Sequence, residues 1–263
     1  MKTLDSNPFT LVLSGGGALG IAHLGVLHDL EQNSIVPQEI VGTSMGGIIG
    51  ACVAIGLKEA EIYKLIKEFS SVYKWISFSW TGNALIDNCK IEKIFEKIFH
   101  DRKMADTAIP LKLIATDLAT GEKRVFAQAD NVMIKDAILA TMAIPGIFDE
   151  HLINGKHYGD GFLCENLGIN EASFDEVLAV DVVGKHSFNP NLPDNFFKTN
   201  NILDMLEKSI RLLIYNQTQT TIRHSDKKIT LLEPHTEKYK TFHFHKVDEI
   251  RALGLSLRSV ELI

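Results

Sequence analysis

The sequence has few cysteines and no pair of them at a metal-binding spacing. Its 263 residues contain three, Cys52, Cys89 and Cys164, which lie far apart. Three scattered thiols exclude a disulfide framework, and without a C-x-x-C pair a thiolate zinc site or a thioredoxin-like redox site is not expected. The N-terminal residues contain no long apolar run of the signal-peptide kind. We therefore expect a cytoplasmic, reducing location.

An excess of basic residues is also missing. The chain has 27 Lys and Arg against 33 Asp and Glu, for a net charge of -6. A nucleic-acid-binding protein needs a dense basic face, so no nucleic-acid partner is expected. The acidic balance also gives no general attraction to anionic membranes, although a local patch would still permit peripheral contact. The length allows one large domain or two small ones, and we expect a single domain over residues 1–263.

Charge is absent from one long stretch, residues 40–57, whose eighteen residues approach the roughly 20 of a transmembrane helix. Each glycine weakens a helix interior by about 1 kcal/mol relative to alanine. This stretch has five, namely Gly42, Gly46, Gly47, Gly50 and Gly56. The pattern therefore predicts a short buried strand, a tight turn and a buried helix in place of a membrane span.

The order of the predicted elements indicates an α/β fold. A strand at 10–14, a helix at 18–32, a strand at 39–42 and a helix at 47–55 form the repeat of a parallel sheet covered by helices. Further elements are expected as helices at 58–73, 90–100, 131–141, 202–223 and 245–257, strands at 111–117, 123–127, 177–183 and 228–232, and a hairpin over 151–158. Residues 242–245 alternate Phe and His, which predicts an edge strand.

The first strand ends in a glycine loop. Residues 15–20 match G-x-G-x-x-G, the dinucleotide-binding fingerprint. That fingerprint also needs an acidic residue at the end of the second strand, whereas Glu39 lies at its start. A non-catalytic dinucleotide-binding protein therefore stays the weaker alternative. The backbone N–H groups of Gly15, Gly16 and Gly17 suit a second role, as an oxyanion hole at a helix N-terminus.

The second strand ends in a serine turn. Residues 42–46 match G-x-S-x-G, the nucleophile elbow, in which Ser44 is held at a sharp strand-to-helix turn and the Met45 N–H points at the developing oxyanion. Both loops fall at the carboxyl ends of parallel strands, where such sheets bind ligands. The alternative for Ser44 is a helix N-cap without catalytic function.

Histidine is a poor candidate for the base. The late histidines fit the residue order of an α/β-hydrolase, but Ser44 follows only the second strand and leaves no room for the strands that normally precede that serine. His243 and His245 lack a third ligand for a metal site. His23 is expected to be a hydrogen-bonded packing residue.

Four blocks of the sequence together resemble the patatin-like phospholipase family. They are residues 14–20, residues 42–46, residues 140–148 and Asp160-Gly161, with Asn166 at a further position that the family often fills. The resemblance implies a three-layer α/β/α sandwich with a mostly parallel central sheet and a Ser–Asp dyad without histidine. It assigns Ser44 as nucleophile and Asp160 as its base, and the N–H groups of Gly15, Gly16 and Gly17 to the oxyanion hole.

Asp160 has rivals among the acidic residues. An Asp-Gly pair is typical of a plain turn, and Asp117, Asp149 and Asp181 are other candidates. An aspartate is a weak base at its ordinary pKa of about 3.9. Burial beside Tyr158 and Phe162 would raise that pKa into the useful range.

Substrate contacts are expected at Pro145 and at Phe162, which either narrows the entrance or joins the core. Leu19 stands where many family members have a basic residue. Residues 69–80 contain both tryptophans and are expected to form either a lid or lipid-docking edge or a helix end packed on the core.

The expected function is that of a serine lipid acyl hydrolase, of phospholipase A, lysophospholipase or carboxylesterase type. The chemistry needs no metal or organic cofactor, and its partner is a lipid or other acyl ester. An acyltransferase that uses the same serine remains an alternative.

Overall fold

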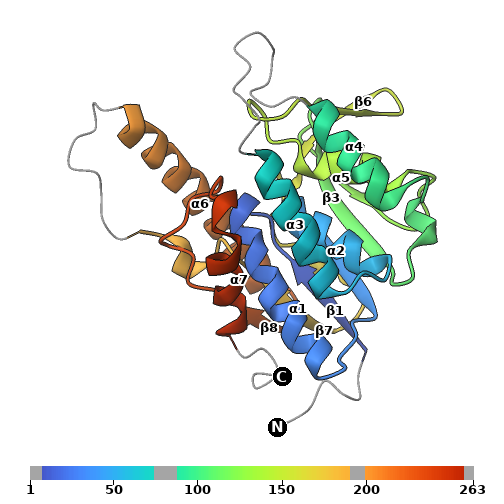
Figure 1. The fold of residues 1–263 in the computed structure, drawn as a ribbon, viewed down its shortest axis with the longest axis horizontal. Coiled ribbons are helices and arrows are strands. Elements are labelled where there is room, and N and C mark those ends of the chain that lie inside the picture. Colours follow the sequence, from blue (N-terminus) through green and yellow to red (C-terminus); the bar gives the residue numbers. More distant parts are fainter. Residues whose placement is uncertain (1–7, 74–87, 190–198, 258–263) are drawn as a thin grey trace.

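The computed structural model describes residues 8–73, 88–189 and 199–257. Within these residues eight strands form one sheet in the order β5-β6-β3-β2-β1-β7-β8, and β4 pairs with β3 beside this path. Figure 1 shows the sheet running through the centre of the molecule. The strands are β1 (Phe9–Leu13), β2 (Glu39–Thr43), β3 (Leu111–Asp117), β4 (Lys123–Phe126), β5 (His151–Ile153), β6 (Lys156–Asp160), β7 (Glu176–Val180) and β8 (Lys228–Leu232).

The centre of the sheet is parallel. Strands β3, β2, β1, β7 and β8 pair in parallel along this order, whereas β4, β5 and β6 are antiparallel additions at the β3 end. The carboxyl ends of the parallel strands therefore meet at one edge of the sheet, called the carboxyl edge below. Ligands of open α/β sheets bind outside this edge.

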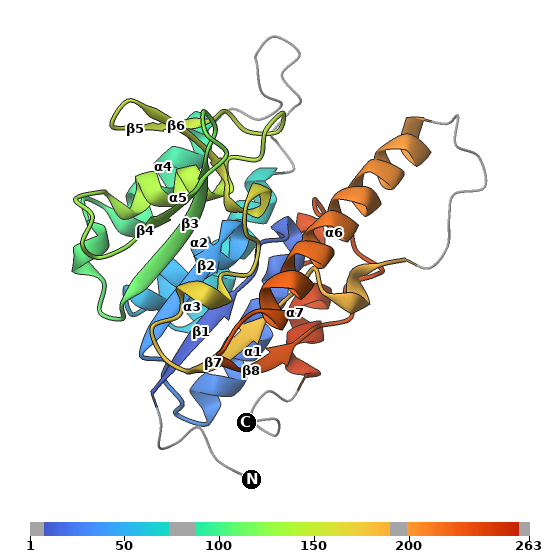
Figure 2. The same ribbon diagram turned by 180° about the vertical axis from the view of Figure 1, so that it is seen from behind.

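Helices cover both faces of the sheet. Alternate residues of a strand face opposite sides, so Leu11 and Leu13 of β1 join a large core, whereas Val12 joins a smaller one that packs against Ile222. The expected three-layer α/β/α arrangement is confirmed (Figures 1 and 2). The large core lies under α1 (His23–Gln32), α2 (Ser44–Ala54), α3 (Glu59–Tyr73), α4 (Asn88–Phe99), α5 (Ile134–Met142) and α7 (Val247–Leu255), and the smaller one under α6 (Thr199–Arg223).

Several boundaries differ from the prediction. A 3-10 helix over Gly17–Ala22 precedes α1, and α2 begins at Ser44 itself, three residues earlier than expected. The hairpin turn is confirmed, because Asn154 and Gly155 both have positive φ, 51° and 78°. No described helix combines the length and apolar character needed to cross a bilayer.

The edge strand expected over residues 242–245 is wrong. This segment is a turn followed by a 3-10 helix over Phe244–Lys246. Local bonds from His243 N to the Lys240 carbonyl and from Lys246 N to the His243 carbonyl satisfy the backbone. The Phe244 side chain is buried and packs edge-to-face against Phe69. Four alternating residues are too short a pattern to outweigh such local hydrogen bonding.

Candidate active site

One edge of β3 brings Ser44 and Asp160 together. β3 has two edges, and β4 pairs along one of them over residues 113–116. Strands β2 and β6 therefore both pair along the opposite edge of β3, one after the other. β2 pairs along β3 as far as Thr43 opposite Ile114, and β6 continues with Asp160 opposite Ala115. The first residue after β2 is Ser44, so the serine turn and the end of β6 meet at the carboxyl edge.

The Ser44 turn is strained and tightly held. Ser44 has a φ of 52°, in the left-handed region that non-glycine residues rarely adopt. Its backbone N–H donates to Thr141 Oγ1 of α5 at 2.9 Å, and the same hydroxyl donates to the Ile114 carbonyl. A Cβ at Gly46 would lie 2.3 Å from the Leu13 carbonyl oxygen, which explains the glycine of the motif. Sequence reasoning missed Thr141, because its role depends on where α5 packs.

The Asp160 carboxyl group is completely buried. Its Oδ1 accepts a hydrogen bond from the Phe162 N–H at 3.0 Å, whereas Oδ2 has no donor in full hydrogen-bond geometry among the described residues. Burial raises the pKa of Asp160 to about 7, and the hydrogen bond from the Phe162 N–H and the nearby Ser44 hydroxyl oppose this rise. A carboxylate with a pKa near neutrality beside a serine hydroxyl is suited to accept its proton.

The glycine loop lies next to the serine. A Cβ at Gly15 would sit 3.0 Å from Ser44 Cβ and 2.7 Å from Asn166 Oδ1. Gly16 and Gly17 have φ values of 154° and 56°, which favour glycine. The Gly15 N–H donates to the Asn166 carbonyl at 3.4 Å. Among the described residues, the N–H groups of Gly16 and Gly17 have no acceptor.

The Met45 N–H is a third free donor candidate. Met45 is the second residue of α2, and the first amides of a helix have no intrahelical acceptor. The Met45 side chain also packs directly against the glycine loop, because a Cβ at Gly20 would lie 2.5 Å from Met45 Cγ. The N–H groups of Gly16, Gly17 and Met45 are thus candidate oxyanion donors without an acceptor among the described residues, whereas the Gly15 N–H is already engaged.

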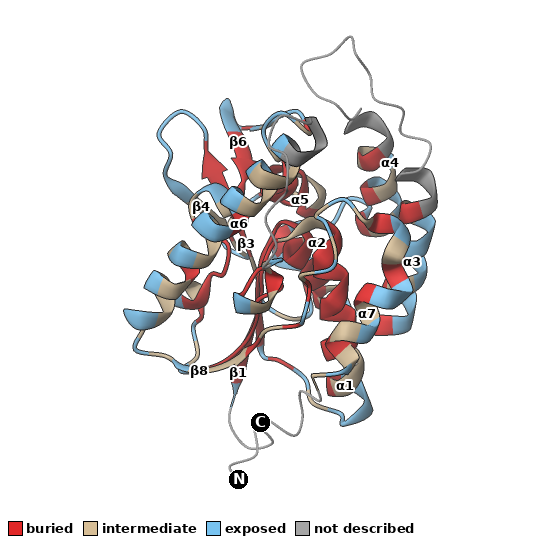
Figure 3. Ribbon diagram, turned by 90° about the vertical axis from the view of Figure 1, so that its left-hand side faces the viewer, coloured by how far each residue is buried: buried red, intermediate tan, exposed pale blue. Residues whose placement is uncertain are grey.

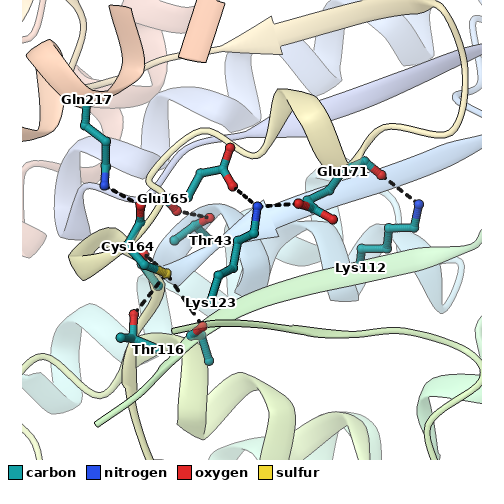
Figure 4. Close-up of polar contacts among 10 residues, drawn as sticks. Thr43, Lys112, Thr116, Lys123, Cys164, Glu165, Glu171 and Gln217 are labelled. Carbon is teal, nitrogen blue, oxygen red and sulfur yellow. Dashed lines mark hydrogen bonds and ion pairs between the residues drawn. The ribbon is translucent and has the colours of Figure 1, made fainter. Parts of the chain in front are cut away.

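A polar network holds the loop that follows Asp160 (Figure 4). Lys123 of β4 lies between the carboxylates of Glu165 and Glu171, with a 2.5 Å contact to Glu165 Oε2. Thr43 Oγ1 donates to the Glu165 carbonyl at 3.3 Å, and Gln217 of α6 donates to the Cys164 carbonyl. The loop is therefore tied to the serine turn, to β4 and to α6.

A comparison with known families identifies the family of the chain. A family model described as patatin-like phospholipase matches residues 11–173, a range that contains the glycine loop, Ser44 and Asp160. The chain belongs to the patatin-like phospholipase family.

Individual relatives of the chain share only about a quarter of its residues. The chain is 26% identical over 276 residues to a protein named Lysophospholipase NTE1 from Kluyveromyces lactis, covering 96% of this chain and 19% of that protein. It is 24% identical over 265 residues to Uncharacterized NTE family protein Mb2594 from Mycobacterium bovis, covering 93% and 44%. The chain thus spans less than half the length of these relatives. The fold is similar to VipD from Legionella pneumophila, with a TM-score of 0.55 at 12% identity over 97% of this chain and 66% of that one.

The rival aspartates of this patatin-like chain lie in other settings. Asp117 caps its own turn, where Oδ1 accepts from the Ala119 N–H and Oδ2 pairs with Lys156. Asp181 is fully buried and burial raises its pKa to about 7, but its side-chain partner is Ser14, not Ser44. Asp149 lines a surface cavity on the β3 side of the molecule.

His23 and Glu39 are both held by local contacts. The His23 ring is fully buried, its Nε2 lies 2.9 Å from the Ser14 carbonyl, and burial lowers its pKa to about 4. A neutral packing histidine is therefore confirmed. Glu39 is engaged by Lys112, Thr10 and Ser173, which leaves no free carboxylate for a dinucleotide ribose.

The two expected substrate-binding residues, Pro145 and Phe162, have different surroundings. Pro145 is exposed and lines a cavity of about 110 Å³ with Leu118, Ala143 and Phe148. Phe162 is half-buried and its N–H contacts Asp160. Trp75 and Trp80 lie outside the described residues. Within the described ranges no cluster of His, Cys, Asp and Glu is arranged to hold a metal ion.

Proposed function

We propose that the protein is a serine lipid acyl hydrolase that uses Ser44 as nucleophile and Asp160 as general base. The observation that carries the proposal is the Ser44 hydroxyl beside a fully buried carboxylate whose pKa is raised to about 7. The residues 1–263 would act as one catalytic domain, because all eight strands of the described part pair in a single sheet.

The reaction would proceed in two steps. Ionised Asp160 takes the Ser44 proton as Oγ attacks the ester carbonyl, and the N–H groups of Gly16, Gly17 and Met45 stabilise the tetrahedral oxyanion. The alcohol leaves with a proton from Asp160, and an acyl-serine remains. Water, activated by the same carboxylate, then releases the carboxylic acid and restores the serine.

The proposed substrate class is a glycerophospholipid or lysophospholipid. Family membership and the lysophospholipase name of the Kluyveromyces lactis relative support this choice. Such substrates lie in membranes or micelles, so the enzyme would work in peripheral contact with a lipid surface. The Pro145 and Phe162 side chains would contact the acyl chain or the head group.

A serine-directed fluorophosphonate tests the proposal. We expect it to label the wild-type chain on Ser44, and we expect Ser44→Ala to lose both labelling and hydrolysis of soluble esters and lysophospholipid. Ser70→Ala, in α3, is the matched control and should behave as wild type. Labelling that persists in Ser44→Ala would refute the nucleophile. Product analysis with an added alcohol separates hydrolysis from acyl transfer, since a transferase yields the new ester in place of the free acid.

A further inference from the structure

Helix α6 is much longer than the strands it connects. Its 25 residues span about 37 Å, whereas β7 and β8 have 5 residues each, or about 17 Å. The two strands are parallel, so the helix between them begins at the carboxyl edge. Its N-terminal half therefore projects past the sheet on the side where Ser44 and Asp160 lie, as Figures 1 and 2 show.

The polarity of this projecting half is inverted relative to an ordinary surface helix. Ile202, Leu206, Ile210 and Leu213 have exposed fractions of 55%, 57%, 36% and 71%. At 3.6 residues per turn these positions fall within an arc of roughly 80°. They form one apolar stripe on the outward face of α6, called the α6 stripe below, among the exposed stretches of Figure 3.

The charged residues of the same half face the protein. Asp204 pairs with Lys240 at 2.5 Å, and the Glu207 carboxylate accepts from the Thr241 N–H and hydroxyl, each at 2.8 Å. Arg211 is 7% exposed and donates to the carbonyls of Ser187 and Tyr239. A surface helix normally buries its apolar residues and exposes its charges. Here the inward side is already satisfied by polar contacts, and the apolar side lacks a covering element among the described residues.

We propose that the α6 stripe is the surface by which the protein docks on a lipid bilayer. This inference rests on the proposed function, because a hydrolase of membrane lipids must reach the membrane surface. The exposed residues next to the stripe along the same face, Ser209, Asn216 and Thr220, are uncharged. A face of this composition suits the acyl region of neutral lipid and offers no charge for an acidic or basic protein partner.

The size of the stripe also favours a membrane over a protein partner. Its four side chains expose on the order of a few hundred Å², whereas each side of a stable protein interface buries about 800 Å². A second copy of the chain paired through this stripe alone would fall short of that area. Shallow insertion into a bilayer has no such minimum, because each apolar side chain contributes separately.

The stripe is also connected to the catalytic loops. Glu207 accepts a hydrogen bond from the Thr241 N–H, and the Thr241 carbonyl accepts one from the N–H of Ala18 in the glycine loop at 2.8 Å. Gln217 holds the Cys164 carbonyl in the loop after Asp160. The helix that carries the stripe is therefore tied to both loops beside Ser44, and a bilayer at the stripe would lie next to the part of α6 that projects past the carboxyl edge.

Vesicle binding by Leu206→Gln/Leu213→Gln tests the proposal. The probe is a sonicated phosphatidylcholine vesicle, and binding is measured by co-sedimentation at low and high salt. We expect the double variant to bind at least about tenfold more weakly than wild type, with little salt dependence in either protein. Its hydrolysis of a soluble short-chain ester should equal that of wild type, while its hydrolysis of vesicle lipid falls with binding.

Val36→Gln is the matched control, since Val36 is also 57% exposed but precedes β2 at the opposite edge of the sheet. Undiminished vesicle binding by the double variant overturns the proposal. The proposal is also overturned if sedimentation equilibrium shows that the wild type is a dimer and the double variant a monomer, while both bind vesicles equally. Loss of soluble-ester hydrolysis in Ser44→Ala is a separate result, so a failed docking surface and a failed catalytic assignment are distinguishable.

Discussion

Thr43 and Asp160 occupy consecutive positions along one edge of β3. Thr43 pairs with Ile114 and Asp160 with Ala115, although their strands run in opposite directions. The close approach leaves no room for a side chain at Gly161, where a Cβ would lie 2.3 Å from the Ile114 carbonyl oxygen. The distance between the proposed nucleophile and base is thus set by backbone pairing.

Activity should rise with pH through about 7. The base must be ionised, and burial holds the pKa of Asp160 at about 7. We expect kcat for a soluble ester to follow a single ionisation near that value, low below it and level above it. Asp160→Asn should lower kcat at pH 8 by at least about 100-fold, whereas Asp117→Asn should leave it within about twofold. A pH profile that is flat from 5 to 8 would contradict this role.

The Asp160 carboxyl group should also lower the free energy of unfolding as pH rises. Between about pH 4 and 7 the folded chain keeps the Asp160 proton while the unfolded chain has lost it, so the free energy of unfolding falls with rising pH across this window. The full penalty, at most about 4 kcal/mol, is present above pH 7. Asp160→Asn should therefore have the higher Tm at pH 8 and lose this advantage at pH 4. Thermal unfolding at the two pH values checks the sign.

Thr141 should position the serine turn. In Thr141→Val the Ser44 N–H and the Ile114 carbonyl both lose their partner, at a cost of about 1–3 kcal/mol each. We expect a lower Tm and a kcat reduced about tenfold at unchanged KM, because the hydroxyl of Ser44 moves relative to Asp160. Thr141→Ser keeps the hydroxyl and should restore most of both values. Equal behaviour of the two variants would show that packing, not hydrogen bonding, matters here.

Gly17 should not tolerate a side chain. Its φ is 56°, and an added Cβ would lie 2.5 Å from the Thr241 carbonyl oxygen. Gly121 has a similar φ of 75° but open space around it. Gly121→Ala therefore measures backbone strain alone, about 1 kcal/mol. Gly17→Ala should in addition displace the oxyanion donors and lower kcat/KM by at least about tenfold, which assays on a soluble ester will show.

The sequence predicted those features that depend on neighbouring residues. The glycine loop, the turn at Ser44 and the hairpin at Asn154-Gly155 are local patterns, and their backbone conformations are confirmed. The parallel centre of the sheet followed from the order of strands and helices.

Features that depend on distant pairings were less accessible. Asp160 was singled out by resemblance, because nothing near it in the chain shows that β6 continues the edge of β2. The Thr141 hydroxyl was missed for the same reason, although the residue lies in one of the blocks that carry the resemblance. The strand expected at 242–245 failed where a short alternation competed with local turns.

The antiparallel arrival of β6 on β3 has a consequence for refolding. Ser44 is placed by the parallel half of the sheet, but Asp160 reaches it only after the chain has returned through α5 and the hairpin. Chains that have completed only the parallel half would bind dyes and resist exchange at β1 and β2, yet hydrolyse no ester. Recovery of activity would therefore require the pairing of β6 with β3 in addition to the parallel centre of the sheet, and it would lag behind the return of helical circular dichroism.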